Sequence, residues 1–321
     1  MNTDIFILIE HLRGKVTDMS CVMLGAARPL AESTSGRVVA VLLGHNAQGL
    51  ASNLAADEVI YIDHPALAEF TSDAYLRVLA GLLAEKQPRA VLLGNTSIGA
   101  DVASGLSARL QLPLISSCRS IGASGMLTCQ ICGGKIMTEC SLADSTTLVT
   151  MIPGGCKPDA GRSGQRPPVV PTNAPALEGL RVTLADYVEP EAGDVDISTQ
   201  PVLVAVGRGI QNKDNLELAQ ELADVLGGAV CASRPVVDQG WLPTTRLVGK
   251  SGKYVKPKLF LALGISGAPE HVEGIVDSEL ILAVNTDPAA PIFSAARYGA
   301  TVDLLDLVPA LTEQVRQAKG G

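Results

Sequence analysis

The first half of the chain alternates between short apolar runs and longer segments whose apolar residues recur every three or four positions. The runs predict β-strands and the periodic segments predict helices, because those spacings match the two structures. Strands are expected at residues 4–11, 36–44, 58–63 and 90–96, and helices at 20–32, 46–56, 74–87 and 98–111. This alternation favours right-handed βαβ units around a parallel sheet.

The pattern changes near residue 115. Residues 115–152 hold shorter apolar stretches, broken by Gly133 and Gly134, and predict antiparallel strands that include one at 146–154. Residues 154–200 are rich in proline, glycine and charge, so little regular structure is expected there beyond a strand at 181–189. The alternation then resumes, with strands expected at 201–207, 228–233, 258–264, 280–285 and 301–306, and helices at 215–227, 269–276, 291–299 and 308–318.

The sequence therefore predicts an α/β protein with two domains, each a mostly parallel sheet flanked by helices. We place an N-terminal domain at residues 1–190, a linker at 191–200 and a doubly wound C-terminal domain at 201–321. The 321 residues are enough for two domains of ordinary size.

Composition narrows the class of protein. The 25 lysines and arginines stand against 33 acidic residues and form no basic stripe, which argues against a nucleic-acid partner. No apolar run approaches the ~20 residues of a membrane span, and Asp4 precedes the first run, unlike the start of a signal peptide. The seven scattered cysteines favour a reducing compartment. We expect the bacterial cytoplasm, or a compartment such as the mitochondrial matrix, and no membrane insertion.

Two glycine motifs resemble phosphate-binding loops without completing them. "GRGIQN", residues 207–212, has Asn212 where the dinucleotide fingerprint needs its third glycine, which argues against a nicotinamide-dependent dehydrogenase. "VGKSGK", residues 248–253, resembles the end of a P-loop, but Thr244 replaces the leading glycine, which argues against an ATPase.

The "CQIC" segment offers one pair of thiols, Cys129 and Cys132, whereas a structural zinc site needs four ligands. We interpret both thiols as small apolar side chains and expect no metal site. No nucleophile–base arrangement stands out either, so no catalytic residues are predicted.

The residues that follow the C-terminal strands offer a different chemistry. Ligands of open α/β sheets bind outside the carboxyl ends of the strands. Those ends carry glycines, neutral hydrogen-bonding groups and cations: Gly207–Gly209, Ser233, Arg234, Gly264–Gly267 and Asn285. Such a rim suits a large polar cofactor with phosphates and an aromatic head.

Four blocks in this half carry a family resemblance. "ASRPVVDQGW", "VGKSGKYVKPKLFLALGISGAPEHVEGI", "AVNTDPAAPIF" and "YGATVDLLDLVP" occur in an order and spacing similar to the alpha subunit of electron transfer flavoprotein. The resemblance covers residues 201–318 closely and the first domain more loosely. It implies that the second domain binds FAD and that a beta subunit completes the site in a heterodimer. The implied cofactor-binding positions are Arg208, Ser233, Arg234, Val248, Gly249, Lys250, Ser251, Ser266, Gly267, Ala268, Pro269, Glu270, His271, Asn285, Asp303 and Leu304.

The same resemblance implies an electron carrier rather than a true enzyme. Arg234, Ser251 and His271 would tune the flavin, since a nearby cation stabilises the charge that reduction adds to the ring. Electrons would come from flavin dehydrogenases, such as the acyl-CoA dehydrogenases of fatty acid beta-oxidation, and pass to an acceptor such as a quinone oxidoreductase. The segment near 115–152 would pack on the beta subunit. The alternatives are an adenine-nucleotide-binding module without redox activity and an electron-bifurcating form of the heterodimer.

Lys250 and Glu270 depart from the family pattern, because neutral residues are common at both positions in relatives. Two opposite charges in neighbouring loops suggest compensation, so we expect their side chains to form an ion pair at the edge of the site.

Overall fold

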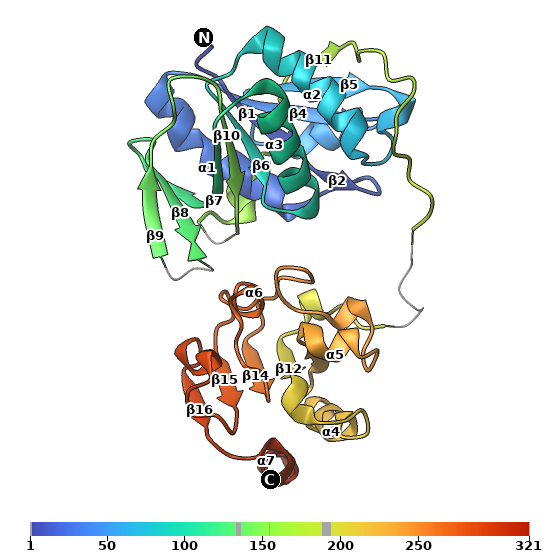
Figure 1. Cartoon of the computed structure of the whole chain (residues 1–321), viewed down its shortest axis with the longest axis vertical. Coiled ribbons are helices and arrows are strands. Elements are labelled where there is room, and N and C mark those ends of the chain that lie inside the picture. The colour runs from blue at the N-terminus through green and yellow to red at the C-terminus, as the bar shows by residue number, and fades with distance from the viewer. Residues whose placement is uncertain (1, 133–135, 154, 188–193, 321) are drawn as a thin grey trace. The chain divides into compact units, whose positions relative to one another are not determined.

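The computed structural model describes residues 2–132, 136–153, 155–187 and 194–320. The chain divides into two compact units, Met1–Asp186 and Tyr187–Gly321, which Figure 1 colours from blue to green and from yellow to red. Each unit has its own sheet and its own buried core.

The first unit is built on a nine-stranded sheet in the order β11-β5-β4-β1-β6-β10-β7-β8-β9. Neighbours from β11 to β7 run parallel, and β8 and β9 run antiparallel to their neighbours. The strands are β1 (Ile5–Ile9), β4 (Val38–Gly44), β5 (Glu58–Asp63), β6 (Ala90–Gly94), β7 (Leu114–Ile121), β8 (Leu127–Ile131), β9 (Ile136–Cys140), β10 (Thr147–Met151) and β11 (Val169–Thr172). A separate short hairpin joins β2 (His11–Leu12) to β3 (Lys15–Val16).

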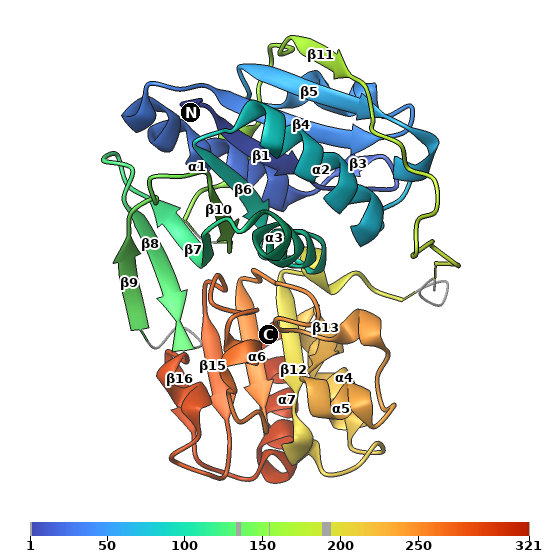
Figure 2. The same ribbon diagram turned by 45° about the horizontal axis from the view of Figure 1, so that its top comes forward.

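Helices cover both faces of this sheet, as Figure 2 shows. Helix α1 (Asp18–Thr34) packs on one face, and α2 (Ser72–Lys86) and α3 (Ser97–Leu110) pack on the other. Alternation along β1 sends Ile7 to the α1 side and Phe6 to the α2 side, and both side chains are buried. Burial on both faces explains why the central strands are continuous apolar runs, and it confirms the predicted parallel α/β fold.

Three local predictions for the first unit were wrong. Strand β10 is parallel, not antiparallel, and lies between β6 and β7 with all five side chains buried. Residues 46–56 form only the short 3₁₀ turn η1 (Gln48–Asn53), because asparagine and glycine at 46, 49 and 53 favour an α-helix poorly. Strand β11 forms in the proline-rich stretch, and the strand expected at 181–189 is absent from the described residues 181–187, while 188–189 lie outside them.

The second unit has a five-stranded parallel sheet in the order β13-β12-β14-β15-β16. Its strands are β12 (Val202–Val206), β13 (Ala229–Ala232), β14 (Leu259–Leu263), β15 (Ile281–Val284) and β16 (Tyr298–Ala300). Its helices are α4 (Leu216–Leu226), α5 (Arg234–Asp238), α6 (Pro269–Val272) and α7 (Leu304–Gly320).

The two faces of this second sheet are covered differently. Helices α4 and α7 bury one face through side chains such as Leu222 and Val308. Loops and short turns bury the other face, where Val248, Ile275 and Ile292 pack around Phe260. The loop-covered face is therefore packed by parts of the segments that follow β13, β14 and β15.

The strand predicted at 301–306 is wrong. Strand β16 ends at Ala300, and α7 begins at Leu304, where the Asp303 carboxylate accepts a 2.9 Å hydrogen bond from the backbone amide of Leu305. Leu304 and Val308 are buried four residues apart, which is the helical period.

The expected linker at 191–200 is described from Asp194 onward, and there it packs on the second unit. Asp194 forms a 2.6 Å ion pair with Arg246, and Ile197 is fully buried.

Within the described part of the chain, no helix combines the length and the apolar character needed to span a membrane.

Candidate functional site

A cavity of about 650 Å³ lies at the carboxyl ends of the second unit's strands. Strand β12 is flanked by β13 on one side and β14 on the other, so the chain reverses its direction of winding between β12 and β14. Such a switch point is where open α/β sheets bind ligands. The cavity is lined by Arg208, Gly209, Ser233, Arg234, Pro235, Val248, Gly249, Lys250, Ser251, Gly264, Ile265, Ser266, Ala268, Glu270, His271 and Asn285.

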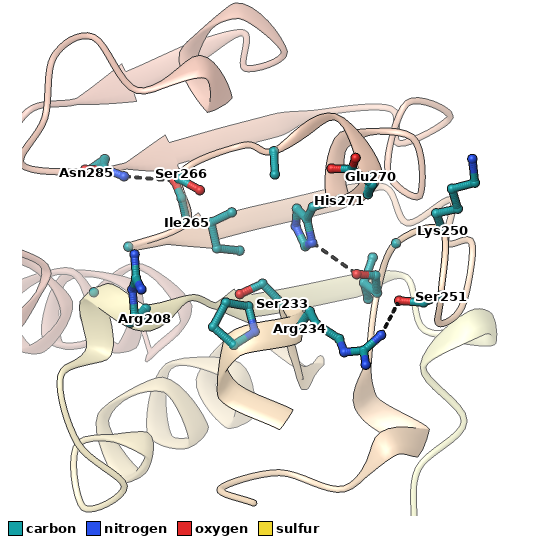
Figure 3. Close-up of a pocket in the computed structure, with 16 residues that line it drawn as sticks. Arg208, Ser233, Arg234, Lys250, Ser251, Ile265, Ser266, Glu270, His271 and Asn285 are labelled. Carbon is teal, nitrogen blue, oxygen red and sulfur yellow. Dashed lines mark hydrogen bonds between the residues drawn. The ribbon is translucent and has the colours of Figure 1, made fainter. Parts of the chain in front are cut away.

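Most of the positions expected from the sequence meet in this cavity. Figure 3 shows Arg208, Asn285 and Ser266 toward one side of the group, and Lys250 and Ser251 toward the other. Of the expected positions, Gly267, Pro269, Asp303 and Leu304 do not line the cavity.

Those four residues have local structural roles. A Cβ on Gly267 would lie 2.2 Å from the backbone nitrogen of Ile292, so glycine lets this loop pack on the next one. Pro269 begins α6, where its missing amide hydrogen leaves no helical bond unmade. Asp303 caps α7, and Leu304 is buried in the core beneath α7.

Gly209, Pro235, Gly264 and Ile265 also line the cavity; they lie in the strand-end segments singled out in the sequence but are not among the positions that the family resemblance implied. Gly209 and Gly264 touch through their backbones: the amide of Gly209 donates a 3.0 Å hydrogen bond to the Gly264 carbonyl. A Cβ on either residue would lie within 2.7 Å of the other residue's Cα. Glycine is therefore needed at these positions because the two loops touch each other. The sequence motif had suggested instead that glycine lets the backbone approach a ligand.

The loop after Leu247 is joined to α6 by its main chain. Gly249 has a φ of +128°, and a Cβ there would lie 2.7 Å from the Glu270 carbonyl oxygen, so this position needs glycine. The next amide, that of Lys250, donates a 2.7 Å hydrogen bond to the same oxygen. The expected ion pair is absent from the described structure, because no side-chain contact within 4.0 Å joins Lys250 to Glu270.

His271 is held inside the cavity wall. Its ring is 7% exposed, and its Nδ1 lies 3.1 Å from the carbonyl oxygen of Val248. Burial lowers the pKa of His271 to about 4, although the Val248 carbonyl opposes the shift. The ring is therefore neutral near pH 7. Because a carbonyl can only accept, Nδ1 carries the proton and Nε2 presents a lone pair.

The Nε2 atom of His271 has no hydrogen-bond partner in the described structure. A buried polar atom without a partner costs about 1–3 kcal/mol. A ligand in the cavity would supply the missing donor.

Arg234 places a guanidinium at the rim. Its Nε donates to Asp238 at 2.8 Å, and its Nη1 lies 3.2 Å from the Ser251 hydroxyl. With Arg208 and Lys250, three cations line a cavity that contains one carboxylate, that of Glu270. This balance favours an anionic ligand.

Comparisons with known proteins agree with this geometry. A model described as "Electron transfer flavoprotein domain" matches residues 5–177, and one described as "Electron transfer flavoprotein FAD-binding domain" matches residues 196–276. The electron transfer flavoprotein subunit alpha of Thermoanaerobacterium thermosaccharolyticum is 36% identical, and the alignment covers 98% of each chain. The protein belongs to the electron transfer flavoprotein alpha-subunit family.

Further relatives of this alpha-subunit family differ in name. The electron transfer flavoprotein subunit alpha of Bacillus subtilis is 35% identical, over 99% of this chain and 98% of the relative. The protein named "Acryloyl-CoA reductase electron transfer subunit beta" from Anaerotignum propionicum is 34% identical, over 98% of this chain and 96% of the relative.

The first unit of this electron transfer flavoprotein subunit has a switch point of its own, between β1 and β6. Glu10 fills it: this residue is 2% exposed, and the Thr96 hydroxyl lies 2.9 Å from both of its carboxylate oxygens. Burial raises the pKa of Glu10 to about 6, against the hydrogen bonds from Thr96 and Gly94. The carboxylate lies at the start of α3, where an open site would attract a phosphate.

The "CQIC" thiols differ from each other. Cys129 is buried against Cys118, as an apolar role requires, whereas Cys132 is exposed, so that part of the interpretation was wrong. Among the described residues, no group of three or more histidine, cysteine or acidic side chains is placed to hold a metal ion.

Proposed function

We propose that this alpha subunit binds FAD in the cavity of its second unit and carries electrons as a heterodimer with a beta subunit. The observation that carries the proposal is the unpartnered Nε2 of His271 in the cavity wall. An atom that is buried and left without a partner points to a missing ligand.

The cavity suits FAD in size and charge. Its volume of about 650 Å³ falls within the range of roughly 300–1,000 Å³ typical of small-molecule sites. Arg208, Arg234 and Lys250 provide charge for a diphosphate and for the negative charge that a flavin gains on reduction. When bound, FAD would supply the redox chemistry, and the chain would bind it, orient it and set its potential.

The beta subunit has a candidate surface on the first unit. β9 is an edge strand, and Ile131 and Ile136 face each other across β8 and β9 with 43% and 50% of their surfaces exposed. An exposed apolar edge strand tends to pair with another chain or to aggregate when it is left uncovered. This tendency supports a partner at β9.

The name of one relative supports a class of electron partner. The Anaerotignum propionicum protein is named as the electron transfer subunit of an acryloyl-CoA reductase. That name supports an acyl-CoA oxidoreductase as the class of electron partner for this chain.

A nucleotide-binding module without redox activity is disfavoured by Glu10. Its buried carboxylate occupies the first unit's switch point, and a phosphate placed there would be repelled by it.

The test uses the full chain co-expressed with its beta subunit. Ala268, an exposed residue that lines the cavity, is replaced by phenylalanine, and Ala318→Phe on the exposed side of α7 is the matched control. The proposal expects bound FAD in the wild type and the control, and its loss in Ala268→Phe, whose thermal midpoint should equal that of the wild type stripped of FAD. Full FAD content in the Ala268→Phe variant would contradict the site.

A further inference from the structure

Asp238 forms an ion pair with Arg234 at the cavity rim, although Asp238 itself does not line the cavity. Helix α5 spans only Arg234–Asp238, which places the two side chains four residues apart on one side of the helix. The Arg234 Nε lies 2.8 Å from Asp238 Oδ1, and Nη1 lies 3.2 Å from Ser251 Oγ. Figure 3 shows the guanidinium turned toward Ser251.

Helix stability does not explain this pair. A carboxylate at the last position of a helix faces the negative end of the helix dipole, which is unfavourable. In this pair the arginine precedes the aspartate, and that order stabilises a helix less than an acidic residue followed by a basic one. The two side chains are 62% and 57% exposed, and such pairs are worth only about 0–1 kcal/mol.

The pair does fix where the positive charge of Arg234 lies. Arginine has many accessible rotamers, and holding its fork in one of them needs partners at more than one nitrogen. Asp238 holds Nε and Ser251 meets Nη1, while Nη2 has no partner within the described part of the chain. Asp238 and Ser251, from two different segments, thus hold the guanidinium. Its Nη2 group can still donate a hydrogen bond to a ligand.

We propose that Asp238 is a positioning residue that holds the Arg234 guanidinium at the flavin. This rests on the proposed function, because it assumes FAD in the cavity. Asp238 acts in two opposing ways: its charge disfavours electron uptake by the flavin, and its hydrogen bond keeps the cation in place to favour it.

Two substitutions separate these effects. Asp238→Asn removes the charge but keeps an oxygen that accepts from Nε, so the flavin should be reduced more easily, with the one-electron equilibrium constant rising about threefold. Asp238→Ala removes the charge and the acceptor, so the constant should lie at least about threefold below that of Asp238→Asn. A tenfold change corresponds to about 59 mV for one electron.

The experiment measures stepwise reduction potentials of the FAD-loaded heterodimer by spectroelectrochemistry. The control variants are Asp224→Asn and Asp224→Ala, since Asp224 lies on α4, pairs with Gln220 and does not line the cavity. Both controls should match the wild type. In an Arg234→Gln background, the asparagine and alanine variants at 238 should give equal constants.

A second readout needs no flavin. The Arg234 Nε–H proton resonance of the FAD-free protein should remain slowly exchanging in Asp238→Asn and become fast in Asp238→Ala. Equal reduction potentials for Asp238→Asn and Asp238→Ala would overturn the positioning role. They would mean that Asp238 acts on the flavin through its charge alone. A wild type without FAD would instead overturn the proposed function.

Discussion

The backbone amide of Lys250 donates a 2.7 Å hydrogen bond to the carbonyl oxygen of Glu270. This bond joins two residues of opposite charge through their main chains and not through their side chains. Any residue except proline could donate it at position 250. The geometry of the two loops does not depend on the charges of these side chains.

The first prediction is that Lys250 and Glu270 act on the flavin independently. Glu270→Gln should raise the reduction potential and Lys250→Gln should lower it, because a nearby anion opposes added electrons and a cation favours them. The double variant should show the sum of the two shifts within about 0.5 kcal/mol, as unpaired sites do. A double variant that returns to the wild-type potential without additivity would show that the ion pair forms after all.

The second prediction concerns His271 and pH. Its pKa is about 4 in the folded FAD-free chain and 6.5 as a free side chain, so the unfolded state takes up a proton first as pH falls. The stability gained from a neutral His271 is complete above pH 6.5 and is lost as pH falls toward 4, by at most about 3 kcal/mol.

Urea unfolding of wild type and His271→Gln at pH 4.5, 5.5 and 7.5 measures this effect. The free energy of unfolding of the wild type should fall more steeply with acid than that of the variant. A difference between them that stays constant with pH would contradict the buried neutral ring.

The third prediction is that Glu10→Gln stabilises the protein at high pH. The pKa of Glu10 is about 6 when folded and 4.5 when free, so the folded state holds the proton more tightly. Stability is therefore lost as pH rises from 4.5 through 6, by about 2 kcal/mol. A glutamine removes this cost and can still accept a hydrogen bond from Thr96.

Thermal unfolding at pH 4.5 and pH 8 tests this, with the exposed Glu32→Gln as the control. Glu10→Gln should exceed the wild type in stability at pH 8 and match it at pH 4.5. Equal stability at both pH values would mean that the carboxylate is not desolvated.

The fourth prediction concerns assembly. Ile136→Lys on β9 should raise the dissociation constant of the heterodimer at least tenfold, because a buried lysine would need a partner. Leu12→Lys on β2 is the control, since Leu12 is 49% exposed, close to the 50% of Ile136, and lies on a separate hairpin. Analytical ultracentrifugation with the beta subunit gives both constants. An equal effect of the two substitutions would move the interface away from β9.

The alternating pattern was sufficient to predict the parallel sheets, because strands such as β1 and β12 are buried on both faces and are followed by amphipathic helices. It was not sufficient for β10, since pairing direction depends on where the chain returns and not on the strand's own residues. The prediction of a strand at 301–306 was wrong for a related reason. The stretch "DLLD" is compatible with a strand or a helix, and the Asp303 carboxylate favours the helix by capping its first turn.

Most of the cavity lining could be predicted, because the cavity lies at the strand ends and the polar residues there are visible in the sequence. Gly267 packs against Ile292 and Leu304 is buried in the core beneath α7, and neither contact is visible in the local sequence. The contact between Gly209 and Gly264 was missed for the same reason. Short sequence motifs show which side chains are available, whereas contacts between loops decide which of them face inward.

The unequal cover of the second unit's sheet has a consequence for how this protein can change. The cavity residues come from strand ends, loops and the short helices α5 and α6, and none belongs to the core cluster under α4 and α7. Selection, or an engineer, can therefore alter the chemistry of the cavity while the helical half keeps the domain folded. The ligand preference of the cavity and the thermal stability of the domain can then be adjusted separately at exposed lining positions, whereas Val248 and Ile265 belong to the core of the loop-covered face and His271 contributes to stability.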